Sequence, residues 1–279
     1  MITALDHFVL VCPDIDAATA EYTTLLGTPP AWAAEQDGMA SAVFSVGNTA
    51  LEVLAPVGAG AVAEKLRGIV ADGARLTSLV YRSDDLASDH HLISRRGLAP
   101  SAIAQNNSTD KVTGAKRQWT SFRIPDAKMA GIKTFLLQPD SELSHRGPLP
   151  GTVTSLDHLV INTPNPERAV ATYGARLGLR FALDRTAEQW KTRFLFFRLG
   201  GLTLEVIHRL GEATDIDADD TIWGLTWATD DLTAARQRLF DAGLDVSEIR
   251  TGRKPGSEVF TLRNGTQGVP TLFIAHSAR

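Results

Sequence analysis

Two distant segments of this chain repeat one pattern, and that repeat limits the possible folds more than any other sequence feature. Residues 4–10 and 155–161 both place Leu-Asp-His before an apolar run, with His7 and His158 separated by 151 positions. Residues 48–54 and 201–207 share a Leu-Glu core, with Glu52 and Glu205 separated by 153 positions. Because the order and the spacing of the two motifs survive together, the chain is predicted to contain a duplicated scaffold.

A second repeated motif divides each half of the chain into two quarters. Residues 79–86 and 225–232 both run from a strand-like stretch into Asp-Asp-Leu. Each of the four quarters begins with a short apolar run and continues with a turn rich in Asp, Pro or Asn, which are residues that start helices. A helical stretch and a glycine follow, and further strand-like runs complete the quarter. This order predicts an α+β fold of four βαβββ modules.

A stretch without periodicity marks the predicted boundary between the two halves. Residues 145–151 contain two prolines and two glycines, a composition typical of linkers. We therefore predict an N-terminal domain over residues 1–144, a linker over 145–153 and a C-terminal domain over 154–279. Each domain would hold two modules.

The duplicated His and Glu side chains are the candidate site residues. His7 and His158 open first strands, whereas Glu52 and Glu205 lie on late strands among apolar neighbours. An ionised carboxylate is costly to bury alone, so each glutamate requires a partner. Imidazole and carboxylate are ligands that Fe, Zn, Mn or Ni accept, and they also serve as acids and bases. A structural His–Glu hydrogen bond without a metal is the simpler alternative.

The βαβββ order, together with Leu-Asp-His and Leu-Glu-Val, resembles the vicinal oxygen chelate superfamily, which contains glyoxalases, extradiol dioxygenases and bleomycin-resistance proteins. The resemblance covers nearly the whole chain. It implies that paired modules form open half-barrel, cup-shaped sheets with helices packed outside. It also implies a divalent metal held by first-strand and last-strand side chains, here His7, Glu52, His158 and Glu205, and bound to neighbouring oxygens of a small substrate.

The even-numbered modules depart from that family pattern. The first-strand positions that match the histidines are Ser78 and Gly224, and the last-strand positions aligned with the glutamates are Phe135 and Phe273. Two ligands per cup fall short of the three that catalytic zinc or iron sites use. Waters, substrate oxygens or a partner chain would complete a metal site; otherwise each cup is a metal-free binding pocket.

Several other side chains are predicted to line a substrate pocket. Trp119 and Arg123 share a strand face by alternation, and Trp223 lies beside Gly224, whose missing side chain would leave room for substrate. Ser78, Phe135 and Phe273 complete the predicted lining. His208 and His276 end strands and are second-tier candidates at the rim of the second cup.

Composition limits the kinds of binding partner that are expected. The 279 residues carry a net charge of −4 with a pI near 6.0, which gives no electrostatic reason to expect nucleic acid or an anionic membrane. The single cysteine, Cys12, is predicted to be inert packing and favours a reducing compartment. No signal peptide or bilayer-spanning stretch is recognised, so a cytoplasmic location is expected. A small-molecule substrate is the expected partner, and a homodimer is kept open.

Two functions follow as hypotheses. The first is a glyoxalase- or dioxygenase-like enzyme, either a lyase or isomerase or a dioxygenase-type oxidoreductase, which acts on a small carbonyl or phenolic substrate. Glu52 or Glu205 would be its base or metal ligand. The alternative is a metal-free protein of the bleomycin-resistance type that binds or sequesters a small molecule.

Overall fold

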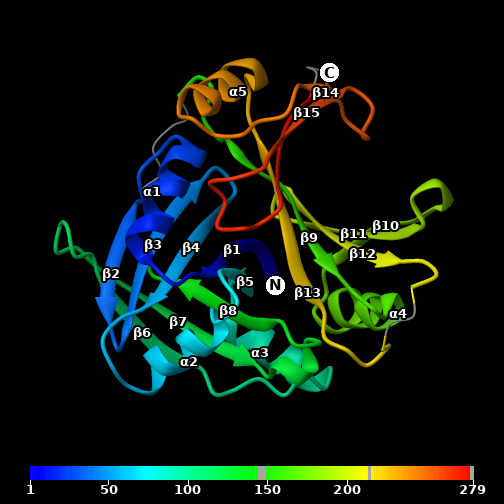
Figure 1. Cartoon of the computed structure of the whole chain (residues 1–279). Helices are drawn as coiled ribbons and strands as arrows, with labels where there is room; N and C mark the ends of the chain where they lie inside the picture. Colours follow the sequence, from blue (N-terminus) through cyan, green and yellow to red (C-terminus); the bar gives the residue numbers. More distant parts are fainter. Residues whose placement is uncertain (142, 144–148, 213–214, 277–279) are drawn as a thin grey trace.

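The computed structural model describes residues 1–141, 143, 149–212 and 215–276. Within this part of the chain, the strands form two eight-stranded sheets, one from each half (Figure 1). Both sheets combine parallel and antiparallel pairs, and helices flank them. The predicted α+β class and the duplicated modules are therefore confirmed.

The first sheet is built from two βαβββ modules in the order β2-β3-β4-β1-β5-β8-β7-β6. The first module comprises β1 (Ile2–Val11), α1 (Ile15–Leu26), β2 (Trp32–Gln36), β3 (Met39–Val46) and β4 (Thr49–Pro56). The second comprises β5 (Arg75–Ser83), α3 (Leu86–Arg95), β6 (Ala104–Thr109), β7 (Lys116–Ile124) and β8 (Lys133–Pro139). The antiparallel pair β1–β5 joins the modules at the centre of the sheet.

The second sheet repeats this topology in the order β10-β11-β12-β9-β13-β16-β15-β14. Its first module comprises β9 (Ser155–Asn162), α4 (Pro166–Ala169) with the π-helical turn η2 (Val170–Arg176), β10 (Arg180–Ala187), β11 (Thr192–Leu199) and β12 (Leu202–Arg209). Its second comprises β13 (Thr221–Ala228), α5 (Leu232–Asp241), β14 (Arg250–Thr251), β15 (Ser257–Leu262) and β16 (Thr271–His276). The short 3₁₀ turns η1 (Asp126–Lys128) and η3 (Glu188–Trp190) precede β8 and β11.

The helices begin where the turn residues predict. Asp14, Asp85 and Asp231 are N-caps whose side chains accept hydrogen bonds from backbone N–H groups of the first turn. Gly27 ends α1 in the left-handed conformation with φ of 77°, which glycine adopts without a steric penalty.

Helix α2 (Ala61–Ile69) is an element that the sequence analysis does not predict. It lies between the two modules of the first sheet, and its Leu66 packs with Val9 and Val11 of β1. Lys65 and Leu66 of this helix also line the cavity of the first sheet that is described below. None of the helices in the described residues is long and apolar enough to cross a membrane.

The two halves share one hydrophobic core. Phe8 of β1 and Trp227 of β13 are fully buried, with ring centroids 6.0 Å apart. The side-chain amide of Asn48 donates to the Leu156 carbonyl at 2.8 Å and accepts from the Leu156 N–H at 2.9 Å. The predicted linker lies partly outside the described residues, but its end at Val153 is buried in this core. Cys12 is also buried, and burial raises the pKa of its thiol to about 11, as expected for an unreactive thiol.

Arg238 of α5 joins the halves by bonding carbonyls at the C-terminal end of α1. Its guanidinium donates to the carbonyls of Thr24, Leu25 and Gly151. Replacing Arg238 by Met removes these charge-assisted bonds and should lower the free energy of unfolding by about 2 to 4 kcal/mol. Urea denaturation measures the change. The control Arg263→Met removes only the exposed pair with Asp245 and should cost at most about 0.5 kcal/mol; equal losses in the two variants would contradict the bridging role.

Candidate functional site

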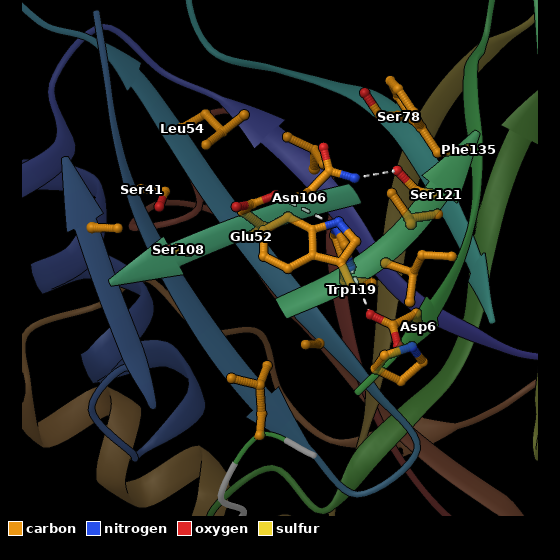
Figure 2. Close-up of a pocket in the computed structure, with 18 of the residues that line it drawn as sticks. Asp6, Ser41, Glu52, Leu54, Ser78, Asn106, Ser108, Trp119, Ser121 and Phe135 are labelled. Atoms are coloured by element: carbon orange, nitrogen blue, oxygen red, sulfur yellow. Dashed lines mark hydrogen bonds and ion pairs between the residues drawn. The ribbon is translucent and has the colours of Figure 1, made fainter. Parts of the chain in front are cut away.

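The concave face of the first sheet holds a cavity of about 900 Å³ that His7 and Glu52 both line. Figure 2 shows side chains from both modules facing this hollow, with Glu52 and Leu54 from β4, Ser78 from β5, and Trp119 from β7. The Nε2 atom of His7 lies 3.4 Å from Oε2 of Glu52. The sheet therefore brings the predicted imidazole and carboxylate together at the wall of one pocket.

A β-bulge places two consecutive polar side chains in this cavity. Leu5 pairs with Tyr81 and His7 pairs with Val80, so Asp6 is the extra residue on β1. Strict alternation would send Asp6 to the opposite face, whereas both Asp6 and His7 line the cavity, and Leu5 is buried in the core. The sequence analysis missed Asp6 for this reason.

Asp6 orients the imidazole, and Arg82 orients Asp6. Oδ1 of Asp6 lies 2.8 Å from Nδ1 of His7, and Oδ2 accepts from Nε of Arg82 at 3.0 Å. These contacts form a chain of interacting side chains that runs from Arg82 through Asp6 and His7 to Glu52. An imidazole held at Nδ1 by a carboxylate presents Nε2 in a fixed direction. Arg82 is a further residue that the sequence analysis did not weigh.

The electrostatics of the first cup favour a charged His7. Burial alone would lower the pKa of His7, but the hydrogen bonds and charges of Asp6 and Glu52 outweigh it and raise that pKa to about 9. Burial likewise favours the neutral form of Glu52, yet His7 and the more distant charge of Arg117 bring the pKa of Glu52 below its ordinary value. At neutral pH the pair is therefore an imidazolium beside a carboxylate.

The second cup repeats the geometry with different partners. A matching bulge at Asp157 places its Oδ1 2.7 Å from Nδ1 of His158. Nε2 of His158, however, lies 2.9 Å from the Thr226 hydroxyl and 3.7 Å from Oε2 of Glu205. The second oxygen of Asp157 contacts His276 at 2.6 Å, where the first cup uses an arginine.

The second cup has Thr226 beside His158 and has His276 where the first cup has Arg82, and these differences change its chemistry. Burial raises the pKa of Glu205, because the charges of His158 and Arg253 do not compensate for lost solvation. Phe194, Trp190 and Phe196 pack with Val160 and Ile207 on the same face of the sheet. His208 bonds the Thr163 carbonyl instead of reaching the pair. The second cup thus has an apolar cluster and a weaker His–Glu contact.

The structure separates the predicted pocket residues into two groups. Ser78, Trp119, Arg123 and Phe135 all line the first cavity. The register of β1–β4 and β5–β8 also makes Ser78 and Phe135 the counterparts of His7 and Glu52, because the pairs His7–Ala50 and Ser78–Lys133 occupy matching positions. In the first cup, the register therefore places the two departures from the ligand pattern at Ser78 and Phe135, the positions that the sequence analysis names.

The residues predicted for the second pocket occupy three different environments. Phe273 is fully buried in the shared core and stacks on Phe260 with centroids 4.8 Å apart. Trp223 is the extra residue of a bulge between Ile222 and Gly224 and is 45% exposed. A Cβ on Gly224 would lie 3.0 Å from the Pro270 carbonyl oxygen, so close backbone packing explains this glycine rather than room for substrate.

The donor set of the first cup does not match a resident catalytic metal. His7 and Glu52 are its two available ligands, and no group of three His, Cys, Asp or Glu side chains with metal-binding geometry occurs among the described residues. Asp6 is occupied by Arg82 and by Nδ1 of His7.

Comparisons with known proteins agree with this architecture. The curated ethylmalonyl-CoA/methylmalonyl-CoA epimerase of Cereibacter sphaeroides is 27% identical over 125 residues, which are 43% of this chain and 86% of the epimerase. A triple mutant of 4-hydroxymandelate synthase from Streptomyces coelicolor superposes with a TM-score of 0.72 at 15% identity, covering 100% of this chain and 94% of the synthase. The Mn(II)-bound glyoxalase from Novosphingobium aromaticivorans gives 0.64 at 14% identity over 98% and 82%. At these identities the two structures show a common fold alone.

Family models match both halves of the chain. The model described as a glyoxalase-like domain matches residues 5–155, which is more than half of the chain. The model described as the glyoxalase/bleomycin resistance protein/dioxygenase superfamily matches residues 157–260. With four βαβββ modules in two sheets, this protein is a two-domain, glyoxalase-like member of the vicinal oxygen chelate superfamily.

Proposed function

We propose that the first cup is an acid–base site that moves a proton at the carbon next to a carbonyl of a small-molecule substrate, as a lyase or isomerase would. The observation that carries this proposal is the Asp6–His7–Glu52 chain at the wall of the 900 Å³ cavity, with Nε2 and Oε2 separated by 3.4 Å. The raised pKa of His7 and the lowered pKa of Glu52 supply an acid and a base side by side at neutral pH.

The chemical step follows from these protonation states. The Glu52 carboxylate accepts the proton of the C–H bond, and the electrons of that bond form a carbon–carbon double bond. The carbonyl oxygen, which receives the displaced π electrons, takes a proton from Nε2 of His7. The product is an enol, and reprotonation at carbon from either face gives exchange or epimerisation. Asp6 and Arg82 hold the imidazole throughout and do not exchange protons with substrate.

The proposed step uses no metal, since the described residues of the cup include no group of three side chains that could hold a metal ion. A panel of small carbonyl acids in D₂O, followed by proton NMR, tests the proposal through deuterium incorporation at the carbon next to the carbonyl. We expect incorporation by the purified protein that dialysis against EDTA leaves unchanged. Loss on dialysis with restoration by Mn²⁺ would contradict a metal-free step.

A second function is favoured by the apolar walls of the same cavity. Val9, Val11, Val80 and Leu137 form a cluster on its surface with the partly buried Trp119 and Phe135. This lining would suit a metal-free protein that binds or sequesters a hydrophobic small molecule. Tight binding of carbonyl compounds without any deuterium incorporation across the panel would favour that function over the proposed enzyme.

A further inference from the structure

The first cavity contains more cations than carboxylates. Lys65, Arg82, Arg117, Arg123 and Lys133 line it, against the carboxylates of Asp6 and Glu52. Arg82 pairs with Asp6, and Arg123 makes two contacts of 2.8 and 2.7 Å with Asp126. No carboxylate among the described residues lies within ion-pair distance of Arg117. Of the three arginines that line the cavity, Arg82 and Arg123 each pair with a carboxylate, whereas Arg117 forms no ion pair with a carboxylate of the described residues.

Two indole rings hold Arg117 in place. Its guanidinium carbon lies 5.3 Å from the Trp32 ring centroid and 5.0 Å from the Trp119 ring centroid. The indole N–H of Trp32 donates to the Ser108 hydroxyl at 2.9 Å, which fixes that ring. Cation–π contacts occupy the faces of a guanidinium and leave its N–H groups in the plane available. The buried Nε of Arg117 has no hydrogen-bond partner among the described residues.

The surroundings of Arg117 favour an anionic ligand. Burial lowers the pKa of Arg117, while the charges of Glu52 and Asp6 act in the opposite direction. An arginine remains charged at such shifts, so its partial desolvation is unfavourable until an anion binds. The same interaction shows that Arg117 and the His7–Glu52 pair share one electrostatic environment, although they lie on β7 and on β1 and β4.

We propose that Arg117, held between Trp32 and Trp119, is the binding site for a carboxylate of the substrate, remote from the carbon that reacts at His7 and Glu52. A planar carboxylate matches two coplanar N–H donors, whereas the tetrahedral oxygens of a phosphate are usually bound by several groups from different directions. Trp119 and Phe135 then contact the apolar part of the substrate. The assignment of the reacting end rests on the proposed function; the carboxylate site itself does not.

The test compares phenylacetate, phenylacetamide and phenyl phosphate as probes, with dissociation constants from isothermal titration calorimetry. The intact wild-type protein should bind phenylacetate at least about tenfold more tightly than the uncharged amide, because a charge-assisted bidentate contact is worth that much or more. Arg117→Met should remove this discrimination. The control Arg123→Met, which changes a lining arginine already paired with Asp126, should retain it.

Failure of this proposal can be told apart from failure of the proposed function. The preference for phenylacetate should persist in Glu52→Gln, which lacks the proposed base but keeps Arg117. Thermal melting confirms that each variant is folded, and the wild-type comparison stands without any variant. Equal affinity for acid and amide, tighter binding of phenyl phosphate than of phenylacetate, or no saturable binding of any probe would overturn the carboxylate site.

Discussion

Replacing Glu52 by Gln should reduce deuterium incorporation into a reactive carbonyl acid on the order of a thousandfold, within the range that general base catalysis usually contributes. The amide keeps the size of the side chain but cannot accept the proton at neutral pH. Because Glu52 lines the cavity wall beside His7 and is not part of the shared core, the fold should be retained.

The duplicated scaffold offers a matched control. Glu205→Gln makes the same change at the corresponding position of the second cup, where His158 bonds Thr226 and the pKa of the carboxyl is raised. This variant should exchange protons at the wild-type rate. A large loss in Glu205→Gln together with wild-type activity in Glu52→Gln would move the reaction to the other cup.

The stability of the protein should fall as the pH rises from 6.5 to about 9, because His7 titrates in that window. Its pKa is raised in the folded state by Asp6 and Glu52, so the folded protein binds this proton more tightly than the unfolded chain. The contribution of protonated His7 to the free energy of unfolding is complete below pH 6.5. It declines as the unfolded chain loses the proton, and it is gone above the pKa of His7 in the folded state. The expected loss is about 3 kcal/mol.

Urea denaturation at several pH values measures this effect against His7→Asn, which cannot titrate. The difference in free energy of unfolding between the two proteins should shrink across the window. Asp6 and Glu52 have lowered pKa values and contribute stability that is lost at acidic pH, outside this range. A difference that stays constant from pH 6.5 to 9 would show that the two carboxylates do not raise the pKa of His7.

Much of the architecture follows from local sequence signals. The Asp-rich turns predict the helix starts that Asp14, Asp85 and Asp231 cap, and the repeated motifs predict four modules in two sheets. The pairing of His7 with Glu52 also follows from the repeat. Helix α2 is not predicted, because its N-cap is Gly60, which has no side chain to accept the capping hydrogen bond that marks other helix starts.

The rest of the site depends on register, which periodicity alone does not determine. A one-residue bulge brings Asp6 into the cavity, and another at Trp223 precedes Gly224. Phe273 aligns with Glu205 in sequence, yet its side chain lies in the core. Arg82 on β5 and Arg117 on β7 are far from His7 in the sequence, so only the packing of the strands shows that they belong to the site. The repeated Asp before each His was the one available signal for Asp6 and Asp157.

The central claim is that His7 is an imidazolium held between Asp6 and Glu52 in the first cavity. Nitrogen-15 NMR of the histidine rings, assigned through His7→Asn, tests it most directly. The account predicts that both ring nitrogens of His7 carry protons at neutral pH and that one is lost near pH 9. A His7 ring that is already neutral at pH 7, with the ordinary pKa near 6.5, would contradict it.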